Sequence, residues 1–248
     1  MIPNIIHFVL ISETDFKQDF LYMYYLSILS AKIVNNPDKI YFYYNFIPKG
    51  YYWDMIKDIL TLEQIELPGY IGKKPLIKMA HKADIIRMNK LSERGGVYFD
   101  IDTISYRPYK HLLENSCVLG IQDEGEICNA ILMTEANHSF FKQWMDVYEM
   151  HFQSHGWAEA SILLPWKLYH SNGNNQIVKL MPKETFFNPG WRNPEQIFQE
   201  NIDVSPELIT LHLWNTQSQR FIKQINNKSW FEKNPHTLYT KIYRSLNI

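Results

Sequence analysis

The chain has 248 residues, of which 46% are hydrophobic and 21% charged, and its formal net charge is −1. This composition is typical of a folded globular protein and excludes a disordered tail or a coiled coil. A charge near zero argues against nucleic acid or an anionic membrane as a partner, because both attract strongly basic proteins. The length suits one sizeable α/β domain over residues 1–248.

Two further features bear on the compartment. Cys117 and Cys128 are the only cysteines, too few for a disulfide scaffold and without the spacing of a metal site. No stretch approaches the roughly 18 consecutive apolar residues of a membrane span, and the N-terminal residues lack the pattern of a signal peptide. We therefore expect a cytoplasmic protein with no transmembrane segment.

Strand and helix patterns alternate along the first half of the chain. Apolar or β-rich runs predict strands over 5–11 and 39–46 and a short one near 65–67. Helical spacing predicts helices over 16–34, 51–60 and 77–94. The last of these ends at Gly95-Gly96, which suits a sharp turn, and a strand over 97–102 follows.

The second half continues the alternation. It contains predicted strands over 117–121, 127–133 and 209–214 and predicted helices over 140–152 and 158–170, with helical material after 214. Strands that alternate with helices indicate an α/β fold with a mostly parallel sheet covered on both faces. We expect a helical C-terminal part after this sheet.

The strand over 97–102 carries two carboxylates. In an extended strand Tyr98, Asp100 and Asp102 point to one face, and the apolar residues between them point to the other. Two carboxylates on one face repel each other unless a cation compensates, and Mg²⁺ or Mn²⁺ with nucleotide phosphates is a common solution. By itself Asp-x-Asp is a weak signal, because such triplets also occur in exposed turns.

The preceding helix places charges on its apolar side. At about 100° per residue, Asp84 and Arg87 project away from the solvent face and lie among Ala80 and Leu91. Charges that face inward must be paired or line a polar cavity. Two interpretations stay open: a buried structural ion pair, or a site in which Asp84 binds sugar hydroxyls and Arg87 binds phosphate or sugar oxygens.

These residues resemble a known family. The stretch from His81 to Arg87, followed by Gly95 to Asp102, resembles the sugar-binding DXD region of family 32 glycosyltransferases, which are related to the clostridial glucosylating toxins. The opening segment 2–7 and the later segment 211–214 resemble two further elements of this family. The resemblance implies a GT-A fold and retaining transfer from a nucleoside-diphosphate sugar, assisted by Mn²⁺ or Mg²⁺.

The resemblance also implies roles for single residues. Asp84, Arg87 and Asp100 would hold the donor and carry catalysis, with Asp100 on the ribose and sugar, while Asp102 would ligate the metal directly. The donor half would span about 1–122, and the acceptor side and closing element about 123–248. No side chain need act as nucleophile, because the leaving phosphate can take the proton of the acceptor.

Other residues are candidates with a structural alternative beside them. His212 would contact the metal or a phosphate, or else be a core histidine; Trp214 would cover the phosphates, or else only pack. Asn129 would approach the sugar. His7 and Val9 lie on the strand that would pass the nucleobase. The Gly-Pro element common in this family is not evident, and Gly156 to Ser161 occupies a similar region; Glu159 would face the acceptor, or else be a carboxylate on a helix surface.

The sequence does not specify the nucleobase of the donor or the acceptor. Leu10 and Ser12 stand where the family usually has a tryptophan and a glycine-containing turn, so base stacking must come from elsewhere. A UDP-sugar is favoured over GDP-mannose, and the acceptor is a glycan, a lipid-linked sugar or a protein. The alternatives are a non-catalytic nucleotide-sugar-binding protein and a metal-dependent phosphodiesterase that uses the same acidic pair.

Overall fold

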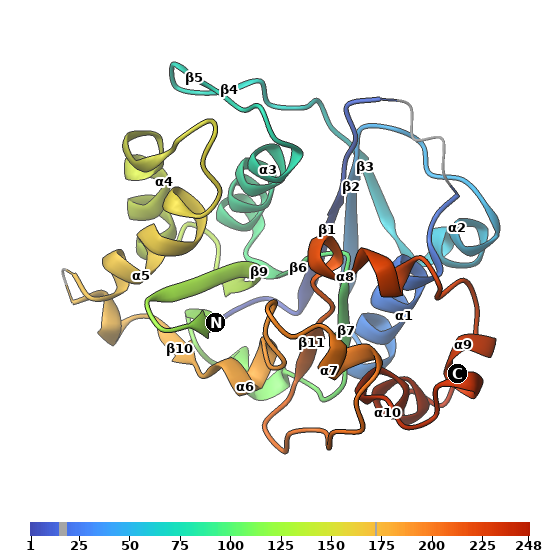
Figure 1. Ribbon diagram of the computed structural model, residues 1–248. Coiled ribbons are helices and arrows are strands. Elements are labelled where there is room, and N and C mark those ends of the chain that lie inside the picture. The colour runs from blue at the N-terminus through green and yellow to red at the C-terminus, as the bar shows by residue number, and fades with distance from the viewer. Residues whose placement is uncertain (15–18, 172) are drawn as a thin grey trace.

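A seven-stranded sheet forms the centre of the computed structural model, which describes residues 1–14, 19–171 and 173–248 (Figure 1). Its strand order is β10-β8-β9-β6-β1-β2-β3. The strands are β1 Ile5–Leu10, β2 Lys39–Tyr44, β3 Thr61–Gln64, β6 Gly96–Phe99, β8 Cys117–Asp123, β9 Glu126–Thr134 and β10 Lys179–Met181. Only β9 runs antiparallel to its neighbours, which confirms the predicted α/β fold with a mostly parallel sheet.

Helices cover both faces of this sheet, as the alternation of side chains along β1 requires. Ile6, Phe8 and Leu10 belong to one apolar core, whereas Val9 belongs to the other. The first core includes side chains of α1 and α10, and the second those of α3, α4 and α5 (Figure 1). The bounds of these helices are α1 Tyr22–Asn35, α3 Met79–Arg94, α4 Ser139–His151, α5 Leu164–Tyr169 and α10 Leu238–Ser245.

Shorter elements complete the chain. Two small sheets pair β4 with β5 and β7 with β11. Their bounds are β4 Tyr70–Ile71, β5 Lys74–Pro75, β7 Thr103–Ser105 and β11 Thr210–His212; the remaining helices are α2 Tyr51–Ile56, α6 Lys183–Phe186, α7 Glu195–Phe198, α8 Asn215–Ile222 and α9 Ser229–Lys233. Among the described residues, no helix combines the length and the apolar character that crossing a bilayer requires.

Several predicted bounds were wrong. The strand expected near 65–67 lies at Thr61–Gln64, and the strand expected over 97–102 ends at Phe99. Of the helix expected over 16–34, residues 15–18 lie outside the described part, and α1 begins only at Tyr22. The helix expected over 158–170 begins with a π-helical turn, Glu159–Leu163, before α5.

The Gly95-Gly96 turn places β6 beside β1. Both glycines have positive φ, 66° and 108°, where a side chain is strained. A Cβ on Gly96 would lie 2.6 Å from the carbonyl oxygen of Ile5, and one on Gly95 would lie 2.7 Å from the backbone nitrogen of Ala136. The tight reversal lets α3 and β6 stay packed against the same strands, so residues of α3 lie close to the segment that follows β6.

Candidate functional site

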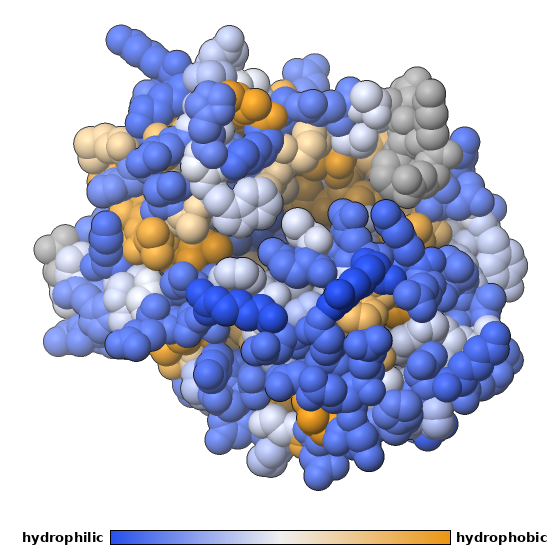
Figure 2. All heavy atoms as spheres, viewed as in Figure 1, coloured by the Kyte–Doolittle hydropathy of each residue, from blue (hydrophilic) through white to orange (hydrophobic). Residues whose placement is uncertain are grey.

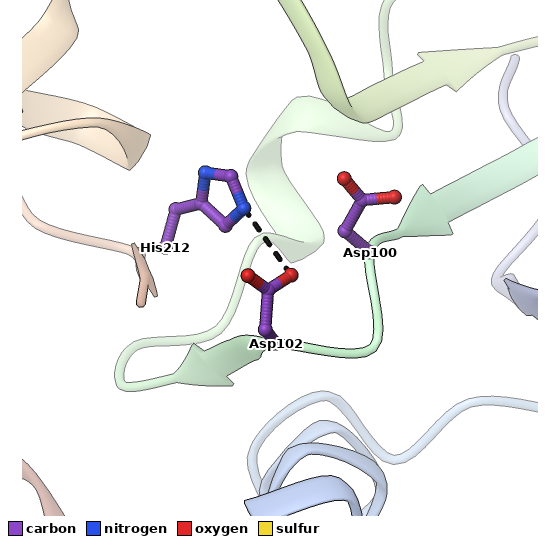
Figure 3. A group of neighbouring side chains, drawn as sticks. All are labelled: Asp100, Asp102 and His212. Atoms are coloured by element: carbon purple, nitrogen blue, oxygen red, sulfur yellow. Dashed lines mark hydrogen bonds and ion pairs between the residues drawn. The ribbon is translucent and has the colours of Figure 1, made fainter. Parts of the chain in front are cut away.

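The segment after β6 is a turn and not the strand that the alternation predicted. Asp100 still donates its backbone N–H to the Ala130 carbonyl, at 2.8 Å, but Thr103 then donates backward to the Asp100 carbonyl, at 3.1 Å. The chain resumes as β7, outside the main sheet. Asp100 and Asp102 therefore approach each other across a turn at the carboxyl end of β6, where open α/β sheets bind ligands (Figure 3).

His212 completes a cluster with the two aspartates. One ligand atom from each of Asp100, Asp102 and His212 lies within 4.8 Å of the others (Figure 3). His212 ends β11, whose antiparallel pairing with β7 sets it opposite Thr103, and its Nε2 lies 3.2 Å from Asp102 Oδ1. The structure thus brings together the three residues that the sequence proposed as metal ligands.

Asp102 is also held by the start of α8. Its Oδ2 accepts the backbone N–H of Asn215, the first residue of that helix, at 2.7 Å. A carboxylate at a helix N-terminus is stabilised by the unpaired N–H groups and the helix dipole. The orientation of Asp102 is therefore fixed from two directions, by His212 and by α8.

Burial and charge act differently on the three groups. Burial raises the pKa of Asp100, and the neighbouring Asp102 charge raises it further, while Arg87 opposes both. Burial alone would also raise the pKa of Asp102, but the charge and hydrogen bond of His212 hold it below its usual value. Burial would lower the pKa of His212, yet Asp102 raises it above the usual value. The cluster is an electrostatically linked set.

This donor set fits a divalent cation. Two carboxylates and an imidazole supply oxygen and nitrogen ligands of the kind that Mn²⁺ and related ions accept. Within the described residues, no protein group donates a hydrogen bond to Asp100 Oδ2, and 26% of the Asp100 side chain is accessible. An accessible carboxylate oxygen beside Asp102 and His212 is thus free to take a cation as its partner.

The inward-facing charges of α3 lie beside this cluster. Asp84 and Arg87 are each only 5% exposed, which confirms that they face the interior. Arg87 lies 3.0 Å from Asp100 Oδ1 and 3.5 Å from Asp84 Oδ1, so its guanidinium joins the helix to the turn after β6. The side-chain amide of Asn129, on β9, donates to Asp84 Oδ1 at 2.7 Å. The backbone carbonyl of Asn129 accepts a hydrogen bond from Arg87, also at 2.7 Å.

Two tyrosines, to which the sequence analysis gave no role, complete the surroundings of Arg87. The centroid of the Tyr98 ring lies 4.4 Å from the guanidinium carbon of Arg87, and the Tyr98 hydroxyl donates a hydrogen bond to Asp100 Oδ1 at 2.6 Å. Tyr148 on α4 donates to Asp84 Oδ2 at 3.3 Å. Tyr148 was missed because, in sequence, it is one of several aromatic residues on the apolar side of a helix, with nothing to separate it from a core residue.

Trp214 lies against His212 with a strained backbone. Its ring centroid is 4.1 Å from that of His212, and its indole N–H donates to the Pro189 carbonyl at 2.9 Å. Its φ of 54° is uncommon for a bulky residue and recurs at functional sites. The strain is consistent with a backbone forced to turn abruptly between β11 and α8.

His7 and Val9 are not brought into the cluster. His7 is fully buried, with Nδ1 2.9 Å from the Tyr43 hydroxyl and Nε2 2.8 Å from the Gly95 carbonyl. Burial lowers its pKa to about 4. Val9 is buried in the apolar core to which α3 and α4 contribute. Above them, Figure 2 shows a hollow with hydrophobic side chains at its base, over the upper ends of β1 and β2. Their contact with a donor stays a prediction.

Comparisons with known proteins agree with this geometry. Residues 18–119, which include Asp100 and Asp102, match a family described as a glycosyltransferase sugar-binding region containing a DXD motif. The chain is 32% identical to glucan organizing enzyme 1 of Cryptococcus neoformans var. grubii, over 92% of this chain and 67% of that protein. It is 27% identical to lactosylceramide 4-alpha-galactosyltransferase of Rattus norvegicus, over 55% of this chain and 41% of the relative.

A solved structure shows the same fold. The glycosyltransferase GlyE of Streptococcus pneumoniae superimposes with a TM-score of 0.56 at 15% identity, over 100% of this chain and 63% of that one. The sheet and the helices on both its faces are those of a GT-A fold. The chain belongs to the glycosyltransferases that carry the DXD-containing sugar-binding region, and Asp100-Ile101-Asp102 is its DXD motif.

Proposed function

We propose that the protein transfers a hexose from a nucleoside-diphosphate sugar to an acceptor hydroxyl, with retention of configuration and with the help of Mn²⁺ or Mg²⁺. The observation that carries the proposal is the contact between a group of cation ligands and a buried guanidinium. The Asp100, Asp102 and His212 cluster, suited to a cation, lies 3.0 Å from Arg87, which is suited to phosphate or sugar oxygens.

The metal would be held by Asp102 and His212, with Asp100 as the third ligand. When bound, such an ion neutralises the negative charge that develops on a leaving diphosphate. An imidazole ligand favours Mn²⁺ over Mg²⁺, because Mg²⁺ prefers oxygen ligands alone. The N-terminus of α8 supports this arrangement, since it keeps Asp102 oriented whether or not an ion is present.

The chain's own side chains orient the donor. Arg87 is fixed between the Tyr98 ring and the Asn129 carbonyl, so its fork of donors faces in one direction before any ligand binds. Asp84, held by Asn129 and Tyr148, would accept hydrogen bonds from sugar hydroxyls. Asp100 is the most exposed of these groups, with 26% of its side chain accessible, and would meet the ribose and the sugar first.

The donor and the acceptor are proposed at the level of class. A UDP-hexose is favoured over GDP-mannose, and the name of the rat relative, which specifies an α-linked galactosyl product, supports a hexose. For a donor whose glycosyl phosphate is α-linked, an α-linked product means retention. The acceptor is a glycan, a lipid-linked sugar or a protein, and membership of family 32 remains our prediction.

One experiment tests the donor and the metal together. UDP-glucose, UDP-galactose and GDP-mannose are each added with and without Mn²⁺, while nucleoside-diphosphate release and thermal unfolding are followed. We expect one donor to be cleaved only with the metal and, at a hundred times its Kd, to stabilise the fold by about 2.7 kcal/mol. Stabilisation without release would indicate binding alone. Full activity of Asp102→Ala in EDTA would refute the metal-assisted scheme.

A further inference from the structure

The turn over residues 153–158 is tied to the first turn of α3. Lys78 donates its ammonium to the carbonyl oxygens of His155 and Gly156, at 3.0 and 2.6 Å. His81 lies one turn further along α3, with Nε2 3.3 Å from the same Gly156 carbonyl. His81 and Asp84 are three residues apart and so are neighbours on the helix surface. The turn therefore lies against the end of α3 that carries Asp84.

This turn presents an exposed tryptophan in a fixed position. Trp157 is 53% exposed, although tryptophan is highly buried on average. Its backbone N–H donates to Glu159 Oε2 at 2.9 Å, and the Lys78 ammonium lies 5.3 Å from its ring centroid. A Cβ on Gly156 would lie 2.3 Å from Glu159 Oε2, so a larger residue there would displace the carboxylate. The backbone is thus held while the indole ring stays accessible.

Glu159, which holds the Trp157 backbone, faces further polar groups. Glu159 also lines a hollow of about 380 Å³, together with Lys74, His151, Gln153 and Lys167. Both signs of charge and a neutral amide lie within it, so the hollow suits a ligand rich in hydroxyl groups better than a highly charged one. The π-helical turn that begins at Glu159 is a rare conformation that recurs at functional sites.

An unpartnered atom lies between this turn and the donor residues. His81 is 3% exposed, and its Nδ1 has no hydrogen-bond partner among the described residues. Burial lowers the pKa of His81. A buried ring nitrogen without a partner costs free energy, which a nearby hydroxyl group would recover. The proposed donor-sugar residue Asp84 lies on the next turn of the same helix.

We propose that Trp157 is the platform on which a pyranose ring of the acceptor stacks, with Lys78 and Glu159 as hydrogen-bonding groups beside it. This inference rests on the proposed function and names the side from which the acceptor enters. The indole face is electron-rich and attracts the C–H groups on the apolar face of a sugar, while the hydroxyl groups at the sugar's edge remain free for polar partners. The ligand class is a neutral glycan.

Separate measurements of acceptor binding and donor cleavage test the proposal. Saturation-transfer NMR follows methyl β-lactoside, methyl β-cellobioside and methyl α-maltoside with the full chain, Mn²⁺ and nucleoside diphosphate. In parallel, cleavage of the nucleotide-sugar by water is measured without glycan. We expect Trp157→Ala to weaken binding of the preferred glycoside about ten-fold. Trp157→Phe should restore part of the affinity, and the rate of donor cleavage by water should stay that of the unmodified protein.

The matched control is Tyr51→Ala, which removes another exposed aromatic ring, on α2, and should leave both measurements unchanged. Glu159→Ala frees the Trp157 backbone and should weaken glycoside binding alone. Unchanged binding in Trp157→Ala, or no binding of any of the three glycosides by the unmodified protein, overturns the inference. Equal loss of water cleavage in Trp157→Ala also overturns it. Absence of metal-dependent cleavage by the unmodified protein counts instead against the proposed function.

Discussion

Two groups of ionisable side chains flank α3 and β6, and they differ in how completely they are satisfied. The first, here called the support cluster, comprises His7, Tyr43, Glu63, Lys90 and Arg94. Glu63 pairs with both Lys90 and Arg94, and Arg94 reaches the Tyr43 hydroxyl at 3.3 Å. Both ring nitrogens of His7 have partners. The support cluster is closed by its own partners, so we expect it to contribute to stability, and a contact of His7 with a donor stays a prediction.

The second group, the donor cluster, comprises Asp84, Arg87, Asp100, Asp102 and His212. Three carboxylates face one guanidinium and one imidazole, and within the described residues one oxygen of Asp100 accepts no hydrogen bond. A buried group that lacks partners costs free energy unless a ligand supplies them. The comparison teaches that incomplete pairing, more than burial or charge, separates a binding site from a structural network.

The largest expected effect comes from Arg87, the cation of the donor cluster. Arg87→Met leaves Asp84 and Asp100 buried without compensation and should lower the free energy of unfolding by about 3–5 kcal/mol. It should also abolish transfer. Urea unfolding and nucleoside-diphosphate release measure the two effects. Arg192→Met, which removes an exposed arginine paired with Asp123, is the control. A loss in Arg87→Met no larger than in this control would contradict the assigned role.

Asp102→Asn should greatly reduce activity at a moderate cost in stability. The amide keeps the shape and still accepts the Asn215 N–H, but it removes the charge that a cation needs. We expect transfer to fall about 100- to 1,000-fold, and the unfolding temperature to fall by less than in Arg87→Met, because only the ion pair with His212 is lost. Asp203→Asn removes a fully exposed carboxylate and should change neither property. Retained activity in Asp102→Asn would place the cation elsewhere.

The support cluster should make the free energy of unfolding sensitive to acid. The folded pKa of His7, about 4, lies below the value of 6.5 expected in the unfolded chain. Between these values the unfolded chain binds more protons, so stability falls as the pH falls through this window and is independent of His7 above about pH 7. Lowering the pH from 7.5 to 5 should cost about 2 kcal/mol through this residue.

His7→Gln should remove that part of the acid sensitivity, and the difference between the two proteins isolates it from other titrating groups. Chemical unfolding at a series of pH values provides the measurement. Substitution of the exposed His111 by Gln should leave the pH dependence as it is. If the His7→Gln protein loses as much stability in acid as the unmodified protein, the histidine is not kept neutral by its site.

The smallest effect is expected for Glu63→Gln. About a quarter of the Glu63 side chain is accessible, and ion pairs with that much exposure contribute little, so stability should fall by about 1 kcal/mol or less. Donor cleavage and transfer should be unchanged, because the open atoms lie in the other cluster. A large loss of activity here would break the division between the two clusters.

Much of the sheet was predictable because local patterns specify it. Apolar runs marked β1, β2, β8 and β9, and the glycine pair marked the end of α3. β11 lies within a predicted strand, but its pairing with β7 was not predictable, because the three residues of β7 carry no periodicity that can be recognised. The end of β6 at Phe99 was missed for a related reason: alternating residues such as Asp100-Ile101-Asp102 fit a strand and a turn equally well.

The site was predictable where its residues are close in sequence. Helical projection placed Asp84 and Arg87 inside the fold, and their connection to Asp100 follows from the short turn between α3 and β6. His212 was proposed only through the resemblance, since 110 residues separate it from Asp102. The backbone contact from Asn215 has no signature in a side chain, and no pattern could have revealed it.

The pairing of β7 with β11 closes a long loop at the donor cluster. This loop runs from Thr103 to His212 and includes β8, β9, α4 and the turn that carries Trp157. Its two ends meet at the donor cluster. A ligand that binds Asp102 and His212 together therefore holds the two ends of this loop against each other. Amide hydrogen exchange in β11 and the first turn of α8 should slow on donor binding, together with that of β7, although about a hundred residues separate them along the chain.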